Sequence, residues 1–100
     1  MITRNGDTLQ LSGPLTLKTV KVAFDHGLQA NGKSRLVVDL AQVEAVDSSA
    51  VSLMLAWLRE AQRSKVSLCF SHIPDNLMSL ARMYGVADLL PQCGDAAAQP

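Results

Sequence analysis

The chain has 100 residues, of which 48% are apolar and 4% aromatic, and its nine basic and nine acidic side chains give a formal net charge of zero. This length supports one core but not two. A neutral chain has no basic field to hold a phosphate backbone, and no run approaches the roughly eighteen apolar residues of a membrane span. Composition therefore disfavours both nucleic-acid binding and a membrane span.

The N-terminal residues predict a hairpin rather than a leader. Residues 1–6 are polar and lack the apolar middle of a signal peptide, which predicts a cytoplasmic protein. Asn5-Gly6 stands between residues 2–4 and the alternating residues 8–11, and this dipeptide is a strong hairpin-turn signal. Gly13-Pro14 is expected to break the second strand.

A helix is predicted from Thr16, where the apolar spacing changes to that of a helix, and Asn31-Gly32 is expected to end it. Its predicted apolar face consists of Leu17, Val20, Phe24, Gly27 and Leu28.

The rest of the chain alternates strands with helices. Residues 36–40 predict a buried, parallel strand, followed by a helix from about Ser49 to Arg63 and a strand over 66–70. Pro74-Asp75 is expected to open a third helix, and Gly85 to stop it. This helix is predicted to bury Leu77, Leu80, Ala81 and Tyr84, and the residues expected to seal one end of the core are Val86, Leu89 and Leu90.

This order of elements predicts a single α/β domain over residues 1–91, with a mixed sheet of four to five strands and helices packed mainly on one face. Residues 92–100 are expected to form a disordered tail. Cys69 lies in an apolar run and Cys93 in the polar tail, which predicts one buried thiol and one loose thiol rather than a disulfide.

Asp47, Ser48 and Ser49 form the most informative local pattern, because they stand directly before the helical run and are residue types that cap helices. The unpaired N–H groups and the positive end of the dipole at a helix start tolerate negative charge. The site is therefore open to a phosphate on Ser48 or to a partner's carboxylate. The alternative is that Asp47 or Ser48 only caps the helix.

The same helix carries a ridge headed by Ser48 and continued by Ser52, Leu55 and Arg59 at helical spacing, with Ala56 beside it. The small Ser52 and Ala56 would let another backbone approach, and arginine often anchors interfaces. Alternatively, Leu55 is half-buried against the first or third helix. The helix is expected to face the sheet with Ala50, Val51, Met54, Trp57, Leu58 and Ala61.

No catalytic pattern accompanies this ridge. His26, His72 and Cys69 lack metal-ligand spacing, and no Gly-rich phosphate loop follows a predicted strand. We therefore expect no metal, no cofactor and no enzymatic activity.

Several of these stretches together resemble the STAS domain family. They are the hairpin, the Leu-Ser-Gly-Pro-Leu stretch (residues 11–15), Val-Val-Asp-Leu (37–40), Val-Asp-Ser-Ser-Ala (46–50) and the closing residues 81–91. The family contains anti-sigma factor antagonists and sulfate-transporter tails. The closing residues look most like the MlaB-type subunits of phospholipid ABC transporters.

The resemblance implies a non-catalytic protein that acts by binding. For an MlaB-type subunit the implied partner is the transporter ATPase, reached at the inner membrane, with Ser48 at the contact. For an antagonist, the implied partner is an anti-sigma factor kinase that phosphorylates Ser48. Antagonists usually carry Gly where this chain has Ala50, and the added methyl is expected to face an approaching kinase or partner.

Overall fold

The computed structural model describes residues 2–29, 32 and 34–93. The elements within them are β1 (Ile2–Asn5), β2 (Thr8–Leu15), α1 (Val20–His26), β3 (Arg35–Val46), α2 (Ser48–Arg63), β4 (Ser67–Ser71), α3 (Asp75–Met83) and the 3-10 helix η1 (Ala87–Leu89). In this part of the chain four strands form one sheet in the order β1-β2-β3-β4. β1 and β2 are antiparallel, and the other pairs are parallel. The predicted α/β class and mixed sheet are confirmed.

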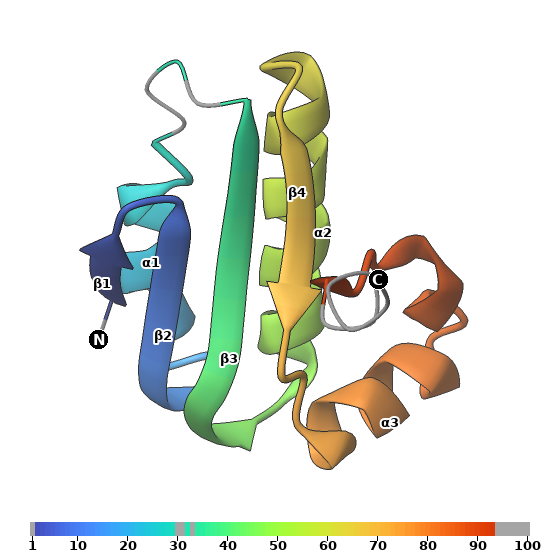
Figure 1. The fold of residues 1–100 in the computed structure, drawn as a ribbon. Coiled ribbons are helices and arrows are strands. Elements are labelled where there is room, and N and C mark those ends of the chain that lie inside the picture. The colour runs from blue at the N-terminus through green and yellow to red at the C-terminus, as the bar shows by residue number, and fades with distance from the viewer. Residues whose placement is uncertain (1, 30–31, 33, 94–100) are drawn as a thin grey trace.

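Helices α1 and α2 cover one face of the sheet, and α3 lies beyond the edge formed by β4 (Figure 1). The central strand β3 shows how the sequence sets this arrangement: Leu36, Val38 and Leu40 are fully buried beneath the helices. Val37 and Asp39, on the other side of the pleat, are only half-buried. None of the described helices is both long and apolar enough to cross a bilayer.

The predicted sheet-facing side of α2 is confirmed for Ala50, Val51, Met54, Trp57 and Ala61, which are all buried. Leu53 is buried as well, and Leu58 is half-buried at the border of the core. Apolar spacing identified this face because α2 is long enough for its periodicity to be unambiguous.

β2 does not stop at Gly13-Pro14, as predicted, but continues to Leu15. Among the described residues β1 pairs with residues 8–11 of β2, so Pro14 lies beyond the part of this edge that β1 covers, where a proline is tolerated. Gly13 has φ 81° and pairs with Val43 next to a register shift, which lets the strand bend and continue.

The predicted start of the first helix at Thr16 is also wrong, because α1 begins at Val20. The Thr19 hydroxyl accepts a hydrogen bond from the Thr16 N–H (2.9 Å) and donates one to the Pro14 carbonyl (2.9 Å). These bonds hold residues 16–19 as a turn. Leu17 therefore stands outside the helix, and its side chain is 76% exposed.

α1 ends at Gly27 rather than at the predicted Asn31-Gly32. Gly27 has φ 66°, a conformation that favours glycine, and its N–H donates to the Ala23 carbonyl at 3.0 Å. Ala23 lies in the core, whereas Phe24 is exposed. The apolar face of this short helix is thus rotated from the predicted one.

The C-terminal segment returns to β4 and is bonded to it. The Phe70 N–H donates to the Pro91 carbonyl at 2.8 Å, and Gln92 pairs with Phe70 in parallel. This pairing brings the Cα atoms of Cys69 and Cys93 to 5.0 Å, and the two cysteines form a disulfide. The prediction of one buried and one loose thiol is wrong, because nothing in the sequence indicated that residues 91–93 run beside β4.

The predicted disordered tail begins too early in the chain, because residues 91–93 run beside β4. Gln92 and Cys93 stay with the domain, and Cys93 is only 7% exposed. The remainder of that predicted tail, residues 94–100, lies outside the described residues.

Candidate functional site at the start and outer face of α2

Asp47 joins β3 to α2 and caps the helix. Its Oδ1 accepts a hydrogen bond from the Ser49 N–H at 2.8 Å, and its Oδ2 accepts one from the Leu17 N–H at 3.0 Å. One carboxylate therefore caps α2 and also fastens the turn before α1 to the start of this helix. Of the two residues predicted as possible caps, the structure selects Asp47.

The hydrogen bonds to Asp47 hold its pKa below the ordinary value of 3.8. The bond from the Leu17 N–H is the largest cause, the N–H and hydroxyl of Ser49 act in the same direction, and desolvation opposes them. The carboxylate is therefore ionised at neutral pH, at the end of α2 where the helix dipole favours negative charge.

This lowered pKa predicts an acid-sensitive contribution to stability. A carboxylate with a lower pKa in the folded state stabilises the fold above its unfolded pKa, and loses that effect as pH falls through the folded pKa. Between pH 5 and about pH 2, we expect the wild-type melting temperature to fall more than that of Asp47→Asn. The amide of Asp47→Asn can still accept from the Ser49 N–H but carries no charge. The melting temperature of this variant at pH 7 should therefore be lower than that of the wild type. A difference between the two proteins that is independent of pH would contradict the prediction.

Ser48 is the first residue of α2, and it is exposed. Within the described residues its hydroxyl makes no hydrogen bond, so the fold leaves it available. The start of α2 was expected to tolerate added negative charge, but one negative group is already there, because the Asp47 carboxylate accepts from the Ser49 N–H. A phosphate on Ser48 would lie beside this ionised carboxylate.

Ala50 does not face outward. It is fully buried, so its methyl group lies in the core rather than in the path of an approaching protein. The prediction that this methyl group faces an approaching partner is wrong, because the turn of the helix places the Ala50 side chain on the face that packs on the sheet.

The ridge predicted along α2 is partly reproduced by the structure. Ser48, Ser52 and Leu55 line one shallow hollow, and Leu55 and Arg59 line the next one along the helix. Ser49 and Ala56 are half-buried and line neither hollow. Leu55 is half-buried and packs on the core, so the alternative considered for it holds in part, while its remaining surface forms the floor shared by both hollows.

The other wall of these hollows was not predicted. Tyr84 and Val86 line the hollow headed by Ser48, and Leu89 lines the hollow beside Arg59. Tyr84 and Leu89, both expected in the core, are exposed, and Leu89 is 59% exposed. Tyr84 continues the apolar spacing of α3, but Met83 is the last residue of this helix and Gly85, at φ 72°, turns the chain away.

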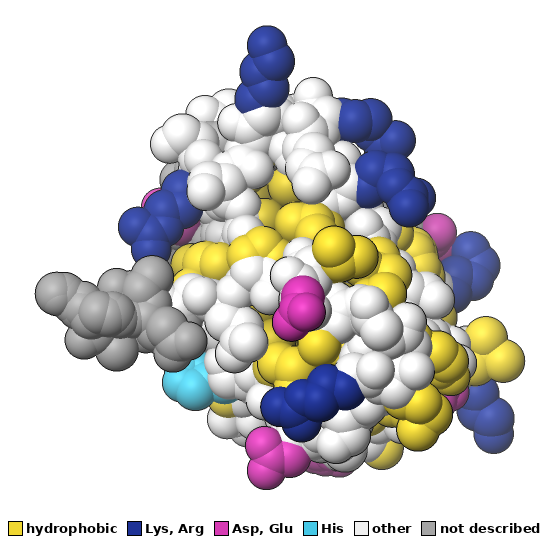
Figure 2. Space-filling model, turned by 90° about the vertical axis from the view of Figure 1, so that its right-hand side faces the viewer, with side chains coloured by type: hydrophobic (Ala, Val, Ile, Leu, Met, Phe, Trp, Pro, Cys, Tyr) yellow, Lys and Arg dark blue, Asp and Glu magenta, His cyan; other side chains and the backbone are white. Residues whose placement is uncertain are grey.

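These residues form part of a larger apolar surface. Figure 2 shows hydrophobic side chains gathered on the side of the molecule where α3 and η1 lie, with Lys and Arg side chains around them. Met83, Tyr84 and Leu89 are its most exposed large members, and Arg59 and Arg82 are exposed basic residues of α2 and α3. We call the surface formed by Ser48, Ser52, Leu55, Arg59, Tyr84, Val86 and Leu89 the α2 groove.

The carboxylates near the sheet are engaged in backbone structure rather than paired with each other. Asp39 Oδ1 accepts from the Ala41 N–H at 3.0 Å and lies 3.2 Å from His72 Nδ1, whereas Asp47 binds the turn at Leu17. Among the residues that the structure describes, no three His, Cys, Asp or Glu side chains are grouped to hold a metal ion.

The mixed sheet, its one-sided helices and an apolar groove beside a capped helix define a small α/β interaction domain. The family model described as "Mlab, STAS domain" matches residues 1–91, and the chain belongs to this STAS family. Its membership supports a non-catalytic role in protein–protein interaction. No curated protein matches the chain.

Proposed function

We propose that this protein is an MlaB-type accessory subunit that binds and regulates the ATPase of a phospholipid ABC transporter. It would act in the cytoplasm and reach the inner membrane through that partner. The α2 groove would be the contact, with Ser48 at one end and Arg59 at the other. Asp47, Ser49 and Ala56 would support the helix beneath the contact rather than line it.

One observation carries this proposal: the groove has exposed apolar side chains that the fold itself does not need. Tyr84 and Leu89 lie outside the buried core, and both are large and well exposed. Exposed apolar clusters rimmed by polar residues are typical of protein-binding surfaces. The MlaB-type family model favours a transporter ATPase as the partner.

A second candidate function is that of an anti-sigma factor antagonist phosphorylated on Ser48. The exposed hydroxyl of Ser48, which makes no hydrogen bond within the described chain, favours it. The buried methyl of Ala50 does not oppose it. Phosphorylation would place about two negative charges beside Asp47, which would repel an acidic partner and strain the start of α2.

The decisive variant is Ser48→Asp, measured for binding to the ATPase subunit of the host's phospholipid ABC transporter. A carboxylate buried at a packed contact is costly, whereas on this exposed helix start it changes the fold little. We expect Ser48→Asp to weaken binding by about thirtyfold or more while the melting temperature stays close to that of the wild type.

Ser48→Ala is the matched control, because it removes the hydroxyl without adding charge. Since Asp47 and not Ser48 caps α2, this variant should keep both the melting temperature and most of the binding. Wild-type affinity in Ser48→Asp would remove Ser48 from the contact. Phosphate on Ser48 in protein isolated from the host, together with a bound kinase, would instead favour the second candidate function.

A further inference from the structure

The outer wall of the α2 groove is a short segment in which Val86 and Ala87 pack partly on the core, while the larger side chains of Tyr84 and Leu89 are exposed. Residues 84–89 follow α3 and include the 3-10 helix η1. Its members Tyr84 and Leu89 are exposed, and Leu90 is the buried side chain that follows them. The position of the end of this wall that carries Leu89 therefore depends in part on how the chain is held immediately after Leu90.

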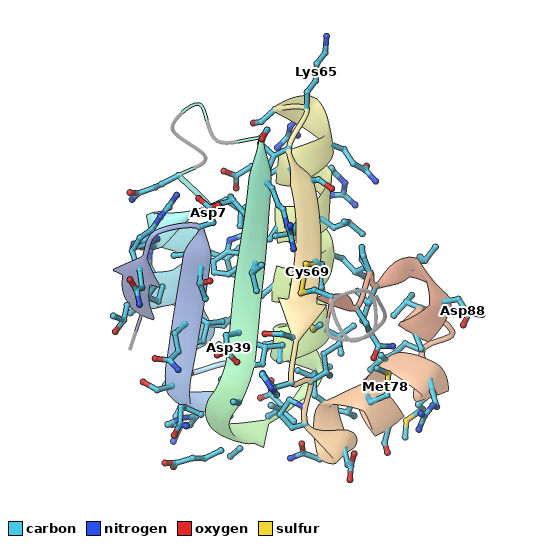
Figure 3. All side chains as sticks on the ribbon, in the orientation of Figure 1. Asp7, Asp39, Lys65, Cys69, Met78 and Asp88 are labelled. Atoms are coloured by element: carbon cyan, nitrogen blue, oxygen red, sulfur yellow. A yellow bond between two sulfur atoms is a disulfide. The ribbon has the colours of Figure 1, made fainter. Side chains whose placement is uncertain are left out.

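After Leu90, the contacts that hold the chain come from β4. The Phe70 N–H donates to the Pro91 carbonyl at 2.8 Å, and Gln92 pairs with Phe70. The covalent contact is the disulfide between Cys69 and Cys93, and Cys93 stands four residues after Leu89 in the chain. Figure 3 shows the Cys69 sulfur on β4, next to the end of the described chain.

We infer that Cys69 and Cys93 form a reversible thiol–disulfide site that controls how firmly the segment 84–93, and with it the outer wall of the α2 groove, is held. The two sulfurs differ in access: Cys69 is half-buried on the sheet face that carries no described helix, while Cys93 is 7% exposed. A reductant therefore reaches the Cys69 sulfur more readily.

The reaction is an exchange with a small dithiol. One thiolate of the dithiol attacks Cys69 Sγ, a new sulfur–sulfur bond forms, and the Cys69–Cys93 bond breaks with Cys93 leaving as a thiolate. The second thiol of the reagent, once deprotonated, attacks its own mixed-disulfide sulfur and releases Cys69. Two electrons pass to the protein and two protons end on its thiols, while the dithiol becomes a cyclic disulfide.

The consequence for binding rests on the proposed function. Cytoplasmic thiol pools keep most cysteines reduced, and the disulfides that form there are commonly transient or redox-sensing. In the oxidised protein the groove wall is fixed and presents Tyr84 and Leu89 in one arrangement. In the reduced protein the segment is held by the Phe70–Pro91 hydrogen bond and by Val86, Ala87 and Leu90, which pack on the core, so a partner must order its C-terminal part on binding.

The test compares hydrogen exchange of the full chain before and after treatment with dithiothreitol. We expect reduction to speed exchange of the Phe70 amide and of amides 86–90 by about tenfold or more. The Gly27 amide, which donates to the Ala23 carbonyl at the end of α1, should be unchanged. In parallel, affinity for the transporter ATPase should fall by about tenfold on reduction.

The double variant Cys69→Ser/Cys93→Ser is the matched control, because it should exchange like the reduced protein and ignore the reductant. Equal exchange of the Phe70 amide in both redox states, or a response of the double variant to dithiothreitol, would overturn the inference. If exchange responds to reduction but neither state binds the ATPase, the thiol site stands and the proposed partner is wrong.

Discussion

Trp57→Ala is expected to lower the free energy of unfolding by about 3–5 kcal/mol, a large share of the stability of a domain of this size. Trp57 lies in the middle of α2, faces the sheet and is only 2% exposed. Its removal would leave a cavity at the centre of the one core that the chain has, since α2 packs there against the buried leucines of β3. Chemical denaturation followed by circular dichroism gives the measurement.

Trp57→Phe is the matched control for this prediction. The indole N–H of Trp57 is buried and has no hydrogen-bond partner among the described residues. A phenyl ring keeps much of the packing and removes this unpaired donor, so the two effects partly cancel, and we expect a change below about 1.5 kcal/mol. A Trp57→Ala protein as stable as Trp57→Phe would show that the core collapses around the gap.

If the α2 groove binds the transporter ATPase as proposed, Leu89→Asp is expected to weaken that binding by about thirtyfold or more while leaving the fold intact. Leu89 lines the α2 groove beside Arg59, and its side chain is 59% exposed, so a carboxylate there stays solvated in the free protein. At a packed contact the same carboxylate would be desolvated without a partner. Titration calorimetry or co-purification measures the binding, and the melting temperature reports the fold.

Val22→Asp is the control for this second prediction, because Val22 is also exposed, at 67%, but lies on α1 and lines neither groove hollow. It should bind like the wild type. Leu55→Asp would be a poorer test, since Leu55 packs on the core and its loss of binding could follow from loss of fold. Equal loss in Leu89→Asp and Val22→Asp would mean that the groove is not the contact.

Most of the fold could be predicted from apolar periodicity. The continuous apolar run over residues 36–40 predicts the parallel strand β3, and the helical spacing in α2 extends over enough residues to fix a buried face. Prediction failed where local signals compete with tertiary context. Pro14 would be expected to break a strand, but here it lies beyond the part of β2 that pairs with β1. Helix α1 has only seven residues, and this is too short for apolar spacing to identify its buried face.

The candidate site shows the same contrast between residues identified by local signals and residues placed by tertiary contacts. The residues Asp47 and Ser48 could be found from sequence because capping is a local property of a helix start. The wall formed by Tyr84 and Leu89 could not, because helical spacing put Tyr84 on the buried stripe, whereas Met83 is the last residue of α3 and Gly85 turns the chain. The bond from Asp47 to the Leu17 N–H spans thirty positions, and no periodicity encodes such a contact.

The pairing of Pro91 and Gln92 with Phe70 also bears on how the protein avoids sticking to copies of itself. An uncovered edge strand offers its N–H and C=O groups to strands of other molecules and so promotes aggregation. Residues 91–92 occupy this position along part of β4. The opposite edge, β1, has only four residues and carries the charged Arg4, and short, charged edges template growth poorly. One edge of the sheet is thus partly covered by the chain's own residues 91–92, and the other edge strand is short.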